Sequence, residues 1–179
     1  MIFTETKLKG AYIIEPEPIK DGRGFFARAW CKQEFKKQSL ITDFVQANIS
    51  FNAKAGTLRG MHYQIAPHEE IKLIRCTRGA IFDVIIDLRP ESVSYRQWIS
   101  VELSADNYRM LYIPKGFAHG FQTLLDISEV YYLHSEYYVP KASTGVRWDD
   151  PAFSIEWPET LRRILSDKDR NWPLYREHN

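Results

Sequence analysis

A short segment of the chain, residues 56–64, gathers side chains that could bind a small anion and move protons. It contains Arg59 and His62 together with Gly56 and Gly60. Arginine binds oxyanions through a planar fork of donors, and histidine can accept and return protons near neutral pH. Glycine lets the backbone bend or approach a ligand closely. This combination predicts an anionic substrate that is handled by acid–base chemistry.

The orientation of these side chains depends on how regular the strand is. In a regular pleat, His62 and Gln64 share one face and Arg59 points to the other. A bulge at Gly60 would re-aim Arg59. From the segment alone, His62 is either a catalytic base or a structural histidine, and both interpretations stay open here.

Three distant residues also have a structural interpretation beside a functional one. Lys72 lies in an apolar run, where it is either an outward-facing lysine at a strand start or a buried cation that needs an anion. Tyr132 lies among apolar and aromatic neighbours, which favours a core residue. Asp169 follows Ser166 at the spacing of a capping box, or it is a carboxylate that orients a histidine.

His119 closes the pattern Pro-x-Gly-x-x-His, which resembles the second signature of the cupins, a family of jelly-roll barrels. Gly56 and His62 match the spacing of the first cupin signature, and Glu69 lies roughly where its acidic residue belongs. Gln64, however, stands in the place of the second histidine. A metal cupin needs three or more strong ligands. We therefore predict no metal and no other cofactor.

Strands dominate the expected secondary structure. We expect one hairpin from residues 71–77 and 80–88, and a second from 98–103 and 109–113. Many short strands at close spacing predict an antiparallel sandwich or barrel. The other expected elements are an edge or arm strand within 1–20, strands at 25–26, 44–50, 118–125 and 129–138, a short helix at 34–40 and a helical turn near 161–165.

Length and composition narrow the class of protein. A chain of 179 residues fits a single domain over residues 1–179. Its 24 Lys and Arg nearly balance 23 Asp and Glu, which argues against attraction to nucleic acid or membranes through net charge. No apolar run approaches the ~18 residues of a transmembrane helix, and the N-terminus lacks the apolar core of a signal peptide. The isolated Cys31 and Cys76 indicate a reducing compartment, so we expect a cytoplasmic protein.

Taken together, the motifs resemble the dTDP-4-dehydrorhamnose 3,5-epimerase family, metal-independent cupins of nucleotide-sugar biosynthesis. The resemblance implies an all-β, cupin-type antiparallel jelly-roll barrel with a few short helices. It also implies a reaction without a cofactor. The matching stretches run in order over nearly the whole chain: residues 21–26, 45–50, 57–64, 72–75, 79–84, 113–121, 137–140, 148–151 and 165–169.

The implied reaction is epimerisation at C3 and C5 of a nucleotide-diphospho-4-keto-6-deoxyhexose through an enolate. By resemblance, His62 is the base and Asp169 orients it. Tyr132 is the proton donor on the opposite face, and Lys72 stabilises the developing enolate. The presence of Tyr132 in the epimerase position makes a 3,4-ketoisomerase the weaker expectation.

The resemblance also implies a set of substrate contacts and a partner. The family is homodimeric, with an exchange of N-terminal strands that brings the Arg23 region near the partner's pocket. The implied contacts are Arg23, Arg59, His119 and Lys168 near the diphosphate or sugar, Gln46 and Asn48 in the pocket wall, and Tyr138 stacked on the base.

Two positions depart from the family pattern. Arg28 and Ser143 stand where relatives commonly carry glutamate. A carboxylate can accept the N3–H of thymine or uracil, whereas arginine can only donate. Our hypothesis is that the base preference is relaxed or moved away from dTDP, for example to a CDP sugar.

Three other functions compete with the double epimerase. A single-centre epimerase would invert only C3 or C5, because the sequence does not fix the number of inversions. A metal cupin oxygenase predicts bound iron or another transition metal, which the His-x-Gln pattern argues against. A non-catalytic sugar-binding cupin predicts binding without proton exchange, although all four catalytic positions are filled.

Overall fold

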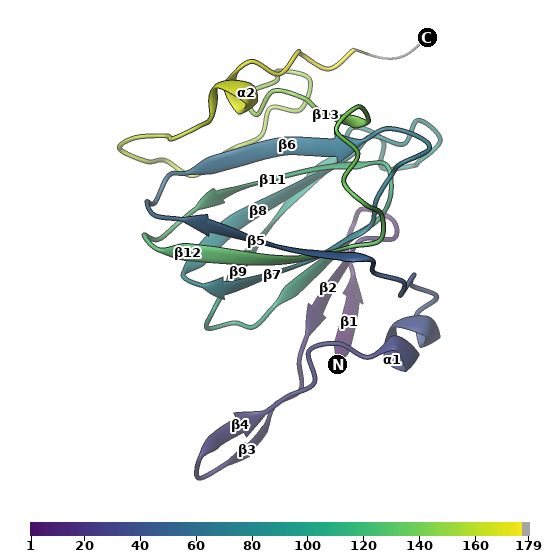
Figure 1. Cartoon of the computed structure of the whole chain (residues 1–179), viewed down its shortest axis with the longest axis vertical. Coiled ribbons are helices and arrows are strands. Elements are labelled where there is room, and N and C mark those ends of the chain that lie inside the picture. Colours follow the sequence, from purple (N-terminus) through teal and green to yellow (C-terminus); the bar gives the residue numbers. More distant parts are fainter. Residues whose placement is uncertain (177–179) are drawn as a thin grey trace.

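Strands are the main regular structure of the computed structural model, which describes residues 1–176 (Figure 1). The elements are β1 (Ile2–Glu5), β2 (Tyr12–Glu15), β3 (Ile19–Asp21), β4 (Gly24–Phe26), α1 (Lys32–Lys37), β5 (Gln46–Asn52), β6 (Leu58–Gln64), β7 (Lys72–Arg78), β8 (Ala80–Asp87), β9 (Trp98–Ser104), β10 (Met110–Ile113), β11 (Phe117–Thr123), β12 (Ser128–His134), β13 (Ser143–Gly145) and α2 (Asp167–Arg170). One sheet has the strand order β1-β2-β10-β7-β12-β5, the second has the order β13-β6-β11-β8-β9, and β3 pairs with β4.

The two large sheets face each other across the main hydrophobic core. Ile74 of β7 and Val130 of β12 belong to the six-stranded sheet, while Ile81 and Ile85 of β8 belong to the five-stranded one, and all four are fully buried. Alternate residues of a strand point to the same side, so these positions line the inner faces. All strand pairs within the sheets are antiparallel. This arrangement confirms the predicted all-β antiparallel jelly roll with a few short helices.

Both sheets are also covered on parts of their outer faces. Phe35 of α1 is buried against Leu73 and Met110 on the six-stranded sheet. Phe153, from the C-terminal segment that runs above β6 in Figure 1, packs near Met61 on the other sheet. The central strands are therefore buried on two sides, which explains the nearly continuous apolar sequence of β8.

The two predicted hairpins are wrong. β7 ends at Arg78 and β8 begins at Ala80, but β7 pairs with β10 and β12 whereas β8 pairs with β9 and β11. Gly79, with a φ of +70°, turns the chain from one sheet into the other. The link from β9 to β10 also crosses between the sheets. Local turn residues mark where strands end, but they do not decide whether the next strand pairs or crosses over.

The helix predictions need correction as well. α1 starts and ends slightly earlier than the predicted 34–40. The helical turn predicted near residues 161–165 is wrong, because Ile164 there forms a β-bridge with Thr57. The helix lies just beyond, where Ser166 caps α2. Within residues 1–176, neither helix is long and apolar enough to cross a membrane.

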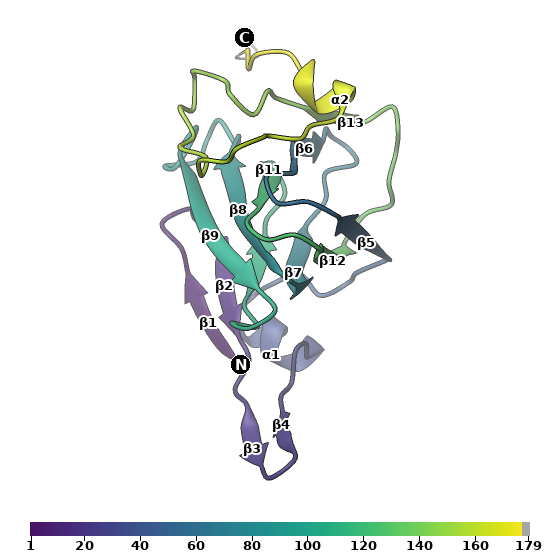
Figure 2. The same cartoon turned by 90° about the vertical axis from the view of Figure 1, so that its left-hand side faces the viewer.

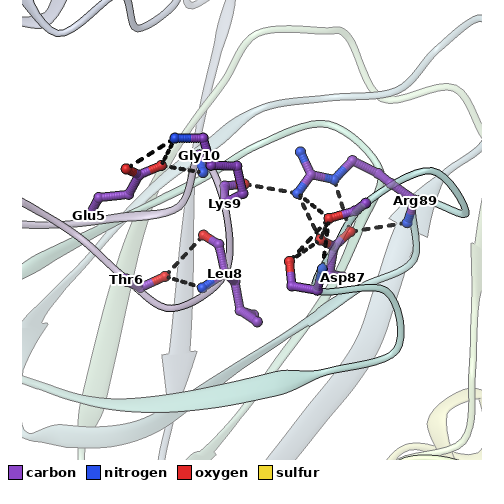
Figure 3. Close-up of polar contacts among 9 residues, drawn as sticks. Glu5, Thr6, Leu8, Lys9, Gly10, Asp87 and Arg89 are labelled. Atoms are coloured by element: carbon purple, nitrogen blue, oxygen red, sulfur yellow. Dashed lines mark hydrogen bonds and ion pairs between the residues drawn. The ribbon is translucent and has the colours of Figure 1, made fainter.

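The first turn of the chain is fixed to the barrel by a partly buried ion pair (Figure 3). Arg89 donates to the carbonyl oxygen of Lys9 at 2.8 Å and to the fully buried Asp87 at 2.7 and 2.8 Å. The hydroxyls of Ser92 and Ser94 also donate to Asp87. Burial raises the pKa of Asp87, but these hydrogen bonds outweigh burial and leave the pKa below its ordinary value. The pair therefore connects the β1–β2 hairpin to the end of β8.

The following ribbon, β3 and β4, projects away from the barrel in both views (Figures 1 and 2). Its strands pair with each other and with no other strand of the described residues. The predicted turn over residues 21–24 forms its tip, and Phe26 in β4 is 75% exposed. The predicted edge or arm strand is thus resolved into the edge hairpin β1–β2 and the first strand of this projecting ribbon.

Candidate active site

A cavity of about 530 Å³ opens between the two sheets. Strands β5, β6, β7, β11 and β12 and helix α2 contribute to its lining. The structure brings together there all four predicted catalytic residues and six of the seven predicted substrate contacts. The predicted residues in the lining are His62, Lys72, Tyr132, Asp169, Gln46, Asn48, Arg59, His119, Tyr138 and Lys168. Ser143, which departs from the family pattern, also lines the cavity.

His62 and Asp169 form a hydrogen-bonded dyad at the cavity wall. His62 Nε2 lies 2.5 Å from Asp169 Oδ1, and Trp172 donates to the same oxygen at 3.3 Å. Burial raises the pKa of Asp169, but the hydrogen bonds from His62, Ser166 and Trp172 outweigh it and lower the pKa. An ionised carboxylate only accepts hydrogen bonds. Nε2 of His62 therefore carries the hydrogen of this bond, and Nδ1 is the ring nitrogen that the dyad leaves unused.

The structure combines a helix cap by Ser166 with a contact between Asp169 and His62. The Ser166 hydroxyl accepts a hydrogen bond from the backbone N–H of Asp169 at 3.1 Å, as in a helix N-cap. The Asp169 side chain is left to bind His62. The cap thus fixes the backbone from which the carboxylate reaches the imidazole.

Of the two strand geometries that the sequence left open, the structure shows the one with a bulge at Gly60. The pairing of β6 with β11 shifts register between His119 and Phe121, and Gly60 has a φ of +138°. A Cβ at Gly60 would lie 2.5 Å from the Cα of Gly120 in β11. Only glycine suits such a close approach in this conformation. The irregularity explains why Arg59 and His62 line the same cavity.

Lys72 is buried, so its interpretation as an outward-facing lysine is wrong. Its side chain is 8% exposed, and its Nζ lies 3.2 Å from Glu70 Oε1. It also donates to the carbonyl oxygen of His62 at 3.4 Å. Glu70 accepts a second hydrogen bond, from His134 Nδ1 at 2.8 Å. The ammonium is thus held inside the cavity by a carboxylate.

Tyr132 lies on the sheet opposite His62. It belongs to β12 of the six-stranded sheet, whereas His62 belongs to β6 of the five-stranded sheet. Burial raises the pKa of Tyr132 and the charge of Asp83 adds to this, against opposing effects of Arg59 and Ser50. The phenol is therefore protonated at neutral pH. His62 and Tyr132 therefore face one cavity from its two walls.

His119 forms a second, fully enclosed histidine–carboxylate pair. Its Nε2 lies 2.7 Å from Asp83 Oδ1, and both side chains are buried. Burial lowers the pKa of His119 and raises that of Asp83. Asp83 Oδ2 is buried without a hydrogen-bond partner among the described residues. His119 therefore lines the cavity as a polar group, and its imidazole is held in position by Asp83.

Sequence reasoning missed Glu70, His134 and Asp83. A sequence signal pointed to only one of them. Asp83 alternates with Ile81 and Ile85 of β8, which places it on the inner face of the sheet. His134 is the register partner of Lys72 across the β12–β7 pair, a relation that only the fold reveals.

Gln64, which replaces a metal-binding histidine of other cupins, supports a loop. Its amide nitrogen donates to the carbonyl oxygens of His68 and Tyr137, and its oxygen accepts from the N–H of Val139 at 2.7 Å. All three of these hydrogen bonds are with backbone atoms. Gln64 thus holds the segment that leads to Tyr138 at the cavity mouth.

Two predicted residues lie outside the cavity. Arg23 lies at the tip of the β3–β4 ribbon, where its side chain is 91% exposed and pairs with Asp21 at 2.6 Å. Arg28 pairs with Glu34 at 2.8 Å, beside the amino terminus of the chain. The predicted role of Arg23 requires a partner protomer and stays a prediction.

Comparison with known proteins relates the chain to a single enzyme family. The family model for dTDP-4-dehydrorhamnose 3,5-epimerase matches residues 5–177. The chain is 45% identical over 165 residues to a dTDP-4-dehydrorhamnose 3,5-epimerase of Escherichia coli K12, covering 92% of this chain and 89% of the relative. A relative of the same name from Methanothermobacter thermautotrophicus is 44% identical over 178 residues, covering 98% and 95% of the two chains.

A solved structure is equally similar. The dTDP-4-dehydrorhamnose 3,5-epimerase of Bacillus anthracis, crystallised with TDP and pyrophosphate bound, superposes with a TM-score of 0.93 at 45% identity. The match covers 97% of this chain and 99% of that one. The chain belongs to the dTDP-4-dehydrorhamnose 3,5-epimerase family.

Proposed function

We propose that the protein epimerises C3 and C5 of a dTDP-4-keto-6-deoxyhexose in deoxysugar biosynthesis. One observation carries the proposal: His62, oriented by Asp169, and Tyr132 face a single cavity from opposite sheets, with the Lys72 ammonium between the same walls. The names of the relatives, which refer to the same reaction, support it.

The residues account for each proton in the reaction. A C–H bond next to the C4 ketone is acidic, because the electron pair left behind moves onto the ketone oxygen as an enolate. His62 takes the proton through Nδ1, and the imidazolium is stabilised by Asp169. Lys72 stabilises the negative oxygen. Tyr132 then donates a proton to the opposite face of the same carbon, which inverts it. Proton exchange with solvent then removes the proton that His62 gained and restores the one that Tyr132 lost.

The remaining lining suits a nucleotide diphosphate. Arg59 and Lys168 offer positive charge for the phosphates, and Arg59 is held by Asn52 at 2.7 Å. Gln46 accepts from the backbone N–H of Tyr138 at 3.2 Å, which connects the pocket wall to the ring proposed to stack on the base. Asn48 and His119 complete the polar surface around the sugar.

For the base, we propose thymine. The relatives named above support it, since each is named for a dTDP sugar. The cytosine hypothesis rested on Arg28 and Ser143. Ser143 lines the cavity, whereas the Arg28 guanidinium is already paired with Glu34 at 2.8 Å. Turnover of matched dTDP- and CDP-4-keto sugars decides between the bases, and a preference for the CDP sugar would contradict this assignment.

We further propose a homodimer with exchanged N-terminal strands, in which Arg23 reaches the partner's pocket. The projecting β3–β4 ribbon supports this. Exposed apolar side chains on β5 and β12 support it as well: Ile49 is 66% exposed, and its register partner Tyr131 and the nearby Phe51 are also exposed. Light scattering of the wild type and of Phe26→Asp tests it. A monomeric wild type would contradict the proposal.

A single domain over residues 1–179 and a cytoplasmic location complete the proposal. The shared core between the sheets supports one domain, although residues 177–179 lie outside the described part of the chain. The two unpaired cysteines support a reducing compartment.

The test is direct conversion followed by NMR. Incubation with dTDP-4-keto-6-deoxyglucose should invert both C3 and C5. Inversion at one carbon would favour the single-centre epimerase, and no conversion of any nucleotide 4-keto sugar would reject the proposal. Elemental analysis of the active protein tests the metal cupin, which requires a transition metal in about equimolar amount.

A further inference from the structure

Glu70 and His134 lie beside the proposed chemical groups, yet the reaction described above gives them no role. Both side chains are largely buried and both line the cavity. Glu70 Oε2 accepts from His134 Nδ1 at 2.8 Å, while Glu70 Oε1 lies 3.2 Å from Lys72 Nζ. One carboxylate therefore joins a histidine to the cation that faces the substrate.

The protonation of this pair follows from its contacts. Burial raises the pKa of Glu70, but the hydrogen bond from His134 and the charge of Lys72 outweigh burial and lower the pKa to about 2. Glu70 is therefore ionised at neutral pH and can only accept hydrogen bonds. Nδ1 of His134 must carry the hydrogen that it donates, so Glu70 fixes the tautomer of the ring.

The pair also restrains the residues around it. Lys72 has a flexible four-carbon stem, and a buried ammonium without a counter-ion is costly. Glu70 provides that counter-ion at a defined position. The ring of His134 stacks on Tyr132, with centroids 5.7 Å apart and planes inclined by 21°. His134 thus contacts both the carboxylate that holds Lys72 and the proposed proton donor.

We propose that Glu70 and His134 are a positioning pair for the epimerisation. Glu70 holds the Lys72 ammonium where the enolate oxygen forms, and His134 orients the Glu70 carboxylate and the Tyr132 ring. This inference rests on the proposed function. Neither residue exchanges a proton with the substrate, so both act through their neighbours.

Two variants and a matched control test the pair. Glu70→Gln removes the charge but keeps the size, and His134→Phe keeps a stacking ring but removes the hydrogen bond. Glu69→Gln is the control, because Glu69 is adjacent in sequence and does not line the cavity. We expect both test variants to lower kcat roughly tenfold or more, as for loss of a hydrogen bond to a charged group, with little change in KM. The control should match the wild type.

A double-mutant cycle separates positioning from a general structural effect. If Glu70 acts through Lys72, adding Glu70→Gln to Lys72→Met should cause no further loss. Deuterium exchange from D2O into the sugar, followed over long incubations, measures the residual activity. An equal loss in both backgrounds, or test variants with a kcat equal to that of the control, would overturn the positioning role alone. Wild-type protein that exchanges no proton of any nucleotide 4-keto sugar would overturn the proposed function together with it.

Discussion

Replacing Asp169 with asparagine removes the charge of the dyad while keeping its size. The wild-type carboxylate accepts from His62 at 2.5 Å and from Trp172 at 3.3 Å. Hydrogen bonds to charged groups contribute about 1.5–3 kcal/mol, which corresponds to roughly 10- to 150-fold in rate if the contribution is made fully in the transition state. If the new amide turns its NH2 group toward His62, the tautomer reverses and the loss approaches about 10⁴. We therefore expect kcat to fall by between about tenfold and 10⁴-fold.

The assay is the initial rate of epimerisation of dTDP-4-keto-6-deoxyglucose, with Asp167→Asn as the control. Asp167 lies in the same short helix and is exposed. The cap should survive in the Asp169 variant, because Ser166 accepts from the backbone N–H. Thermal unfolding checks that both variants are folded. An Asp169→Asn rate within about twofold of the control would refute the role of the dyad, since that difference is worth less than 0.5 kcal/mol by the usual conversion of about 1.4 kcal/mol per tenfold.

Three further predictions follow from the same structure. Tyr132→Phe should still exchange substrate protons with D2O but should not invert the carbon, which NMR detects; inversion at the wild-type rate would exclude Tyr132 as the donor. Gly60→Ala should destabilise the fold by roughly 1–3 kcal/mol, because of its positive φ and its approach to Gly120; an unchanged melting temperature would contradict this. Asp87→Asn should cost roughly 3 kcal/mol, at the low end for a broken buried pair because Arg89 is 24% exposed. Since the folded pKa of Asp87 is lowered, its contribution is present above the unfolded pKa and is lost as pH falls through the folded pKa; urea unfolding at neutral and acidic pH measures it.

The strand content was predictable because its signals are local. Alternating apolar residues and turn residues located most strands to within a few positions. The pairing of the strands is not local. Arg78-Gly79 has the composition of a hairpin turn, yet the chain crosses there to the other sheet. Likewise, Ile164 was expected in a helical turn, but its bridge to Thr57 lies far away in sequence.

In the site, too, the contacts between residues far apart in the sequence could not be predicted from local signals. His62 and Asp169 are 107 residues apart, so only the family resemblance linked them before the structure did. Lys72 and Tyr132 look like a surface lysine and a core aromatic until the register of β7 and β12 is known. Glu70 was missed because a charged residue at a strand start usually faces solvent. Its role depends on the buried contacts of neighbouring strands.

In the proposed mechanism, His62 removes protons from the sugar on one wall of the cavity. Deuterium incorporation from D2O into dTDP-4-keto-6-deoxyglucose, located by NMR, measures this step at each carbon. We predict label at both C3 and C5 with the wild type, and none above the background rate with His62→Asn. Exchange by His62→Asn at the wild-type rate would contradict it.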